Sequence, residues 1–148
     1  MYKRILVAID GSETSDHALQ EAVKLARNQQ SMLRIVYAID EVNINAGSEF
    51  PYPEELENAE EKYVLGILEK AQDSAHSAGI KAESRLLRID KLGLRIADAI
   101  IEEAKSWPAD LLVLGTHGRS GLSHLLLGSV AEGIIRISPV PILLIRAK

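Results

Sequence analysis

The sequence has no cysteine, no long apolar run and no excess of basic residues. Without cysteine, the 148-residue chain forms neither disulfides nor thiolate metal sites, as suits a reducing compartment. No apolar run approaches the ~18 residues of a membrane span, and the one at the N-terminus is too short for a signal peptide. The net charge of −4 argues against a nucleic-acid surface, which needs clustered Lys and Arg. We therefore expect a cytoplasmic protein that binds neither nucleic acid nor membrane.

Two common nucleotide-binding motifs are also absent. The chain contains no Walker A sequence, G-x4-G-K-[ST], and no G-x-G-x-x-G fingerprint after its first apolar run. It shows no internal repeat, low-complexity tract or domain linker. Since 148 residues is the length of one typical domain, we expect a single domain over residues 1–148.

What the sequence does contain is a regular alternation of short apolar runs with segments of helical spacing. Continuous apolar runs are typical of strands that are covered on both faces, as in a parallel sheet. Strands are predicted at Ile5–Ile9, Arg34–Ile39, Lys81–Ile89, Leu111–Gly115 and Pro141–Ile145. Helices are predicted over Ala18–Ala26, Pro53–Ala78, Ile96–Ala104 and Val130–Ile137. This order indicates an α/β fold, a single doubly wound domain with helices on both faces of the sheet.

In such a sheet a ligand binds beyond the carboxyl ends of the strands, where the strand order reverses. Two loops suit that position: "AIDGSET" after the first strand and "GTHGRSG" after the fourth. If these strands are neighbours, both loops face one crevice.

The second loop has the features of an anion site. Gly115 and Gly118 allow the backbone to turn so that successive N–H groups face a ligand. Gly128 and Ser129 precede the last predicted helix, whose N-terminus offers further N–H groups to a phosphate. Two anion sites on one unit indicate a polyphosphate. The alternative is a capping box, in which Ser129 and Glu132 satisfy the helix start without a ligand.

Asp10 stands near the tip of the first predicted strand. Its carboxylate suits ribose hydroxyls or a metal ion. The alternative is an Asx turn, with Asp10 and Ser12 capping the first helix. Both roles are compatible, because the carboxylate has two oxygens.

These residues together resemble the universal stress protein family. Gly115, Gly118, Gly128 and Ser129 fit its nucleotide-binding pattern G-x2-G-x9-G-[ST], and "ILVAIDGSETSDHAL" and "SPVPILLIRAK" resemble its two ends. The resemblance implies a five-stranded parallel sheet in the order 3-2-1-4-5. Because all three signature glycines are present, it also implies ATP binding.

Carried over by position, the resemblance implies a complete set of contacts. Asp10 meets the ribose, the phosphates or a metal, Mg or Mn, and Ala8, Ile9 and Ala38 line the adenine pocket. Ala8 departs from the proline that some members have there, which we expect to alter the fit slightly. The ribose and phosphate contacts fall on Gly115, His117, Gly118, Arg119, Gly128, Ser129 and Val130.

The sequence favours binding over catalysis, because no catalytic constellation can be assigned. We expect an ATP-binding regulatory or stress-response protein, with ADP or AMP as other occupants. The alternative is a slow ATP hydrolase or phosphotransferase that uses the same pocket, in which Asp10 is the residue best placed to activate water. A third hypothesis is a structural dimer with an empty pocket.

The last predicted strand suggests a partner. In the implied order it lies at a sheet edge, yet Val140–Ile145 is among the most apolar runs in the chain. Exposed apolar edges pair readily with other chains. We therefore expect a homodimer in which two copies of this strand pair across a two-fold axis. The alternative is that a helix or the "RAK" tail covers this edge.

Overall fold

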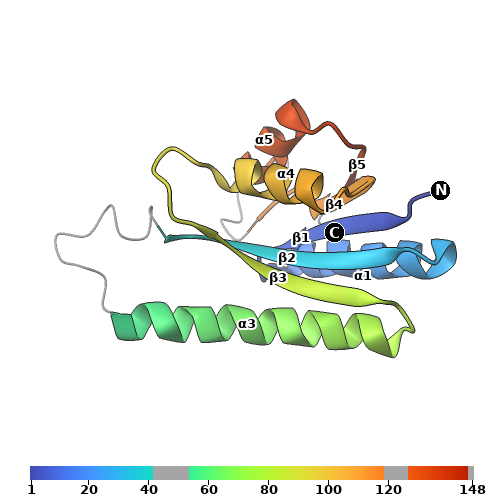
Figure 1. The fold of residues 1–148 in the computed structure, drawn as a ribbon, viewed down its shortest axis with the longest axis horizontal. Coiled ribbons are helices and arrows are strands. Elements are labelled where there is room, and N and C mark those ends of the chain that lie inside the picture. The colour runs from blue at the N-terminus through green and yellow to red at the C-terminus, as the bar shows by residue number, and fades with distance from the viewer. Residues whose placement is uncertain (42–53, 119–126, 147–148) are drawn as a thin grey trace.

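The structure, a computed structural model, describes residues 1–41, 54–118 and 127–146. These residues form a five-stranded sheet with helices on both faces (Figure 1). The strands are β1 (Arg4–Ile9), β2 (Met32–Asp40), β3 (Ala82–Ile89), β4 (Leu111–Gly115) and β5 (Ile142–Ile145). The helices are α1 (Glu13–Gln29), α3 (Glu54–Ser77), α4 (Ile96–Ser106) and α5 (Ser129–Ile137). None of the helices within the described ranges has both the length and the apolarity of a membrane span.

The strand order is β3-β2-β1-β4-β5, and every pair of neighbours is parallel. At the centre of the sheet, Ile5 of β1 pairs with Leu33 of β2 on one side and with Leu111 of β4 on the other. The predicted doubly wound fold and its implied order are therefore confirmed. The more polar β3 lies at one edge, as its composition predicts.

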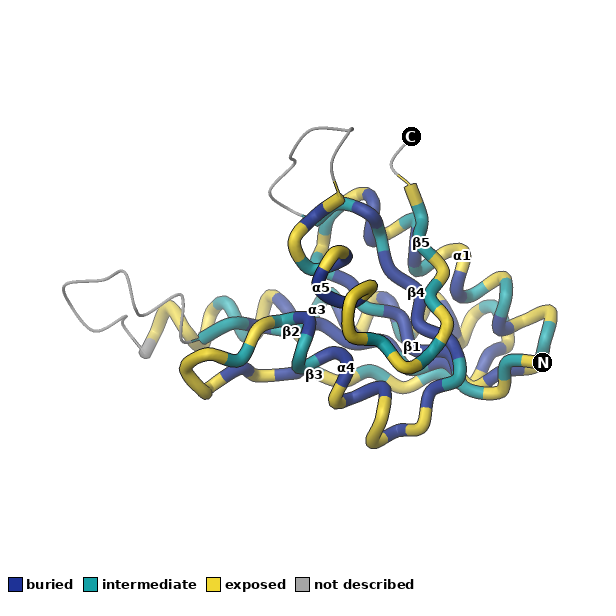
Figure 2. The backbone as a smooth tube through the Cα atoms, turned by 90° about the horizontal axis from the view of Figure 1, so that it is seen from above, coloured by how far each residue is buried: buried dark blue, intermediate teal, exposed yellow. Residues whose placement is uncertain are grey.

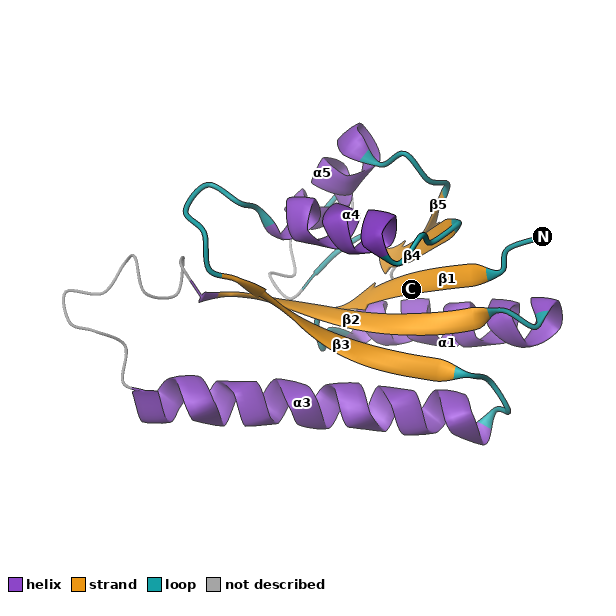
Figure 3. Cartoon of the chain, viewed as in Figure 1, coloured by secondary structure: helices purple, strands orange, loops and turns teal. Residues whose placement is uncertain are grey.

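Side chains of the central strands point alternately into two hydrophobic cores, one on each face of the sheet. Ile5 and Val7 pack toward α1 and α3, whereas Leu6 packs toward α4 and α5. Figure 3 shows the two helix pairs on opposite faces of the sheet, and Figure 2 shows buried residues concentrated along the inner strands. Burial on both faces explains why these strands are continuously apolar in the sequence.

Helix boundaries follow the local signals closely. The long helix α3 is followed by Gly79, whose positive φ of 81° is one that glycine adopts readily. Trp107 caps the C-terminus of α4 just before Pro108, and Ser138 caps α5 just before Pro139. The remaining differences are of one or two residues at most strand and helix ends, and α1 begins earlier than its apolar stripe, at Glu13.

Candidate functional site

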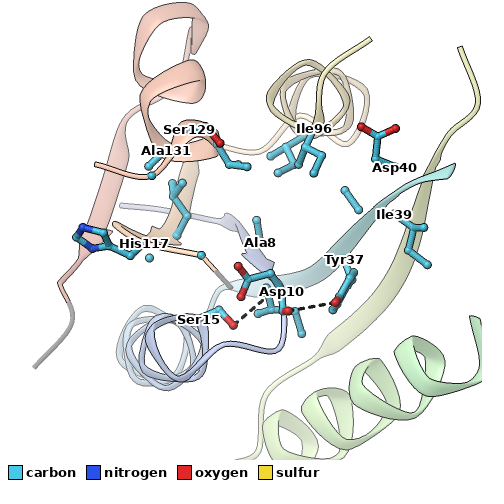
Figure 4. A pocket seen from close by; sticks show the side chains of 18 of the residues that line it. Ala8, Asp10, Ser15, Tyr37, Ile39, Asp40, Ile96, His117, Ser129 and Ala131 are labelled. Carbon is cyan, nitrogen blue, oxygen red and sulfur yellow. Dashed lines mark hydrogen bonds between the residues drawn. The ribbon is translucent and has the colours of Figure 1, made fainter. Parts of the chain in front are cut away.

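The strand order reverses between β1 and β4, which lie side by side at the centre of the sheet. β1 leads into α1 on one face, and α5, which follows β4 in the chain, covers the other face. A reversal of this kind leaves a crevice beyond the carboxyl ends of the strands. A cavity of about 470 Å³ lies there, and Figure 4 shows it from close by.

The cavity gathers ten of the eleven site residues that the sequence singled out. Its walls include Ala8, Ile9, Asp10, Ala38, Gly115, His117, Gly118, Gly128, Ser129 and Val130. Arg119, the eleventh, lies outside the described residues. The fold thus brings together positions from the ends of β1, β2 and β4 and from the start of α5.

Asp10 divides its two carboxylate oxygens between a turn and the cavity. Oδ1 accepts a hydrogen bond from the backbone N–H of Ser12 at 2.9 Å, and the Ser12 hydroxyl in turn accepts from the N–H of Ser15 at 3.2 Å. Oδ2 faces Gly118 so closely that a Cβ there would lie 2.7 Å from it. The Asx turn is therefore confirmed, and Oδ2 is the oxygen that lies toward the glycine turn (Figure 4).

The three signature glycines are required by close packing. A Cβ on Gly115 would lie 2.6 Å from Cγ2 of Thr14 at the start of α1. A Cβ on Gly128 would lie 3.2 Å from the carbonyl oxygen of Thr116, and Gly118 leaves room for the Asp10 carboxylate. A side chain at any of these three positions would push apart two walls of the cavity. The glycines thus let the β4 turn, the α1 start and the α5 start approach one another.

The start of α5 has no side-chain cap among the described residues. Gly128 is the N-cap, and its N–H donates to the carbonyl oxygen of Thr116 at 2.7 Å. Ser129 is already the first helical residue, and Glu132 instead pairs with Arg136 at 2.9 Å. The alternative of a capping box formed by Ser129 and Glu132 is therefore wrong, because the helix begins one residue too early for it. No described residue accepts a hydrogen bond from the N–H groups of Ser129, Val130 and Ala131, and all three residues line the cavity.

Thr116 connects this turn to the edge strand. Its side chain is 6% exposed, its N–H donates to the carbonyl oxygen of Ile145 at 2.9 Å, and its hydroxyl lies 2.9 Å from Nδ1 of His117. The His117 ring lies at the side of the cavity, away from Ala8 and Asp10 (Figure 4). The turn is thus held from both sides, by β5 and by α5.

The other end of the cavity is lined by apolar residues. The small side chains of Ala8 and Ala38 lie partly buried on the α4 side of the sheet, whereas the Ile9 and Ile39 side chains pack into the core on the α1 side. Larger apolar residues complete the wall on the α4 side: Ile96, Ile100 and Leu114. Apolar walls of this kind are typical of pockets that hold the flat rings of small ligands.

Several wall residues carry no signal in the sequence. Ile96 comes from the start of α4, and Tyr37 reaches under β1, where its hydroxyl donates to the Asp10 carbonyl oxygen at 3.1 Å. Only tertiary packing brings them to the cavity. Asp40 and Thr116 were detectable, since each lies at or just past the carboxyl end of a central strand.

The charged residues in the described part of the wall are all acidic: Asp10, Asp40 and Glu60. Lys and Arg are lacking there, so the positive character of this part of the wall comes from backbone N–H groups at the α5 start. Among the described residues, no group of three or more His, Asp or Glu side chains is arranged to hold a metal ion.

The sequence model described as "Universal stress protein family" matches residues 1–146. The chain belongs to this family. It is 34% identical to universal stress protein YxiE of Bacillus subtilis over 153 aligned positions, which cover 99% of this chain and 100% of YxiE.

Solved structures with sequence similarity to this chain share the whole architecture. The hypothetical protein MJ0577 superposes with a TM-score of 0.84 at 28% identity, covering 100% of this chain and 98% of that one. A universal stress protein in complex with cAMP superposes with a TM-score of 0.70 at 29% identity, covering 98% of this chain and 97% of that one. At least one structural relative therefore binds an adenine nucleotide.

Proposed function

We propose that this protein binds an adenine nucleotide, ATP foremost, and acts as a cytoplasmic, nucleotide-dependent regulator of a stress response. The observation that carries the proposal is the uncapped start of α5 beside the glycine turn, with an apolar slot at the other end of the same cavity. Helix N-termini bind phosphate through free N–H groups and the helix dipole. The family member solved with cAMP supports adenine as the base.

The proposed contacts follow from the difference between the two ends of the cavity, one with helix N–H groups and the other apolar. The phosphates lie between the Gly115–Gly118 turn and the Gly128–Val130 start of α5, where the Ser129 hydroxyl adds a donor. The adenine ring lies in the slot beside Ala8 and Ala38. Oδ2 of Asp10, which is not engaged in the turn, accepts from a ribose hydroxyl or binds a metal ion.

A divalent metal fits the site only together with the nucleotide. Mg²⁺ is commonly bound by one or two carboxylates and by substrate phosphates, and Asp10 supplies one such oxygen. Mn²⁺ suits the same oxygen ligands. In this arrangement the ion screens the phosphate charge from the acidic wall.

Isothermal titration of the purified protein with Mg-ATP, Mg-ADP and AMP tests the proposal. We expect saturable binding of one nucleotide per chain. If none of the three binds, the proposal is wrong, and the hypothesis of a structural dimer with an empty pocket takes its place.

A slow hydrolase or phosphotransferase is the second candidate, because Asp10 Oδ2 lies beside the proposed phosphate turn. Incubation with labelled ATP distinguishes the two functions. We expect bound ATP without repeated turnover. Multiple turnovers that disappear in Asp10→Ala would establish the enzymatic function instead.

We also propose that the protein forms a homodimer through β5. Among the described strands, β5 is paired only with β4, and Leu143 on it is 36% exposed. Ile135 and Ile137 of α5, the helix that precedes this strand in the chain, are exposed as well. Light scattering should show a dimer that Leu143→Lys converts to monomer, whereas Leu65→Lys on α3 leaves it intact. A folded, dimeric Leu143→Lys variant would count against this interface.

A further inference from the structure

A second cavity, of about 380 Å³, adjoins the first. The two share four wall residues: Asp40, Ile96, Ser129 and Val130. Ser129 and Val130 belong to the anion end of the first cavity, while Asp40 and Ile96 belong to its apolar end. Because it borders both ends, the second cavity opens from the side of the first. We call it the side cavity.

The close packing of α4 on α5 forms one boundary of the side cavity. A Cβ on Gly133 of α5 would lie 2.9 Å from Cβ of Ala97, in the first turn of α4. The glycine therefore allows the starts of the two helices to lie together. The same position is 3.9 Å from Nη1 of Arg95, so this arginine reaches from the α4 start to α5.

Arg95 is held in place by its own helix. Its Nε and Nη2 donate to the two carboxylate oxygens of Asp98 at 3.2 and 3.3 Å, and its backbone N–H donates to Asp98 at 3.0 Å. The hydrogen bonds to Asp98 raise the pKa of Arg95 above its ordinary value. Nη1 takes part in none of these bonds. The guanidinium is thus oriented by Asp98 with one nitrogen directed toward α5.

Lys91 is the second cation of the side cavity. A turn brings it back toward α4: the N–H of Leu94 donates to the Lys91 carbonyl oxygen at 3.3 Å, and Gly93 adopts a positive φ of 90°. The described wall of the first cavity has no Lys or Arg. The described wall of the side cavity thus has two cations, Lys91 and Arg95, beside the one carboxylate of Asp40 that it shares with the first cavity.

We propose that the side cavity binds a second phosphate group of the nucleotide, separate from the phosphate at the glycine turn. This inference rests on the proposed function. Lys91 and Arg95 supply the charge, and Arg95 Nη1 donates to a phosphate oxygen. The side cavity borders both ends of the first cavity, so a phosphate on the ribose reaches it most directly. A phosphate on an extended 5′ chain is the other phosphate group that could bind there.

Titration calorimetry with three nucleotides tests the proposal. AMP carries only the first phosphate, adenosine 3′,5′-bisphosphate adds one on the ribose, and ADP adds one on the chain. Wild-type protein should bind the bisphosphate roughly tenfold more tightly than AMP, the effect of about one charge-assisted hydrogen bond. Lys91→Gln and Arg95→Gln should each remove most of that preference and leave AMP affinity unchanged. Arg136→Gln, on exposed α5 surface, is the matched control.

The outcomes distinguish a failure of the side-cavity proposal from a failure of the proposed function. If the variants lose a preference for ADP instead, the side cavity binds a chain phosphate and the proposal stands with that source. If AMP binds but no second phosphate improves affinity, or if the preference survives in both variants, the side cavity does not bind phosphate. If wild-type protein binds none of the three, the proposed function fails and this inference fails with it.

Discussion

Two helices begin beside the same cavity, and they differ in whether a side chain caps the first turn. At the start of α1, Ser12 caps the helix, and Ser15 both donates to the Ser12 carbonyl oxygen and accepts from the Asp10 N–H. At the start of α5, Gly128 supplies no side chain, and no described side chain takes its place. Among the described residues, a side chain accepts from a first-turn N–H at the start of α1, and none does so at the start of α5. The proposed function places the ligand at the second of these starts.

At a third helix start beside the cavity, that of α4, Asp98 accepts the N-cap N–H of Arg95 at 3.0 Å. At α5 the N-cap N–H of Gly128 is bonded as well, to the carbonyl oxygen of Thr116. Among the described residues, a side chain accepts from a first-turn N–H at the start of α1 and not at the starts of α4 and α5. The α5 start differs from that of α4 because it adjoins the glycine turn, which is where the proposed function needs an anion site.

Closing the space at the glycine turn should have the largest effect on binding. Gly118→Ala would place a Cβ 2.7 Å from Oδ2 of Asp10, so either the turn or the carboxylate must move. We expect roughly a tenfold or greater loss of ATP affinity by calorimetry, since overpacking costs about 1–3 kcal/mol. Gly66→Ala is the matched control, because no atom lies within 4 Å of its Cβ position. Equal affinities of the two variants would contradict the close approach.

Removing the cap of α1 should affect stability and not binding. Ser12→Ala deletes the acceptor for the Ser15 N–H, and the loss of an N-cap costs about 1 kcal/mol of unfolding free energy. Urea denaturation should show this loss, while ATP affinity at saturating Mg²⁺ stays within about twofold. A large loss of affinity would mean that the α1 start also binds the ligand.

Ser129→Ala should show the opposite pattern. Ser129 is exposed and caps nothing in the described structure, so the free energy of unfolding should change little. Loss of one hydroxyl donor to a phosphate should weaken ATP binding about fivefold. If this substitution destabilises the apo protein as much as Ser12→Ala does, the two helix starts are not different in kind.

The smallest effect is expected at α4, as a dependence on pH. The hydrogen bonds and charge of Arg95 lower the pKa of Asp98 below its ordinary value. The stabilisation is therefore fully present above the ordinary aspartate pKa and is lost as the pH falls through the lowered, folded-state value. Because the pair is exposed, its contribution is small. The difference in melting temperature between wild type and Asp98→Asn should be slight at pH 7 and should vanish in acid; a difference that grows in acid would contradict this role.

The sequence was sufficient to predict the sheet and the location of the cavity. The apolar runs at Ile5–Ile9 and Leu111–Gly115 are continuous because both of their faces are covered. Once these strands are known to be neighbours, the loops that follow them must share a crevice. The spacing of Gly115, Gly118 and Gly128 then marks the turn.

The sequence could not show what the folded chain places opposite each residue. The S-x-x-E pattern at Ser129 looks the same whether the helix begins at Ser129 or one residue later, so the capping box could be rejected only from the structure. The glycines suggested room for a ligand, yet each is also required by a protein neighbour. Lys91 and Arg95 are unremarkable in a polar loop, and only the folded structure shows that they lie in a cavity wall.

The difference between the two helix starts can be observed directly by NMR. In a titration of ¹⁵N-labelled protein with Mg-ATP, we expect the largest amide shifts at Thr116–Gly118 and Gly128–Ala131, with much smaller shifts at Glu13–Asp16. Saturation with ATP that leaves the amides of the α5 start unshifted, or that shifts the α1 start most, would contradict the claim that this open helix start binds the nucleotide.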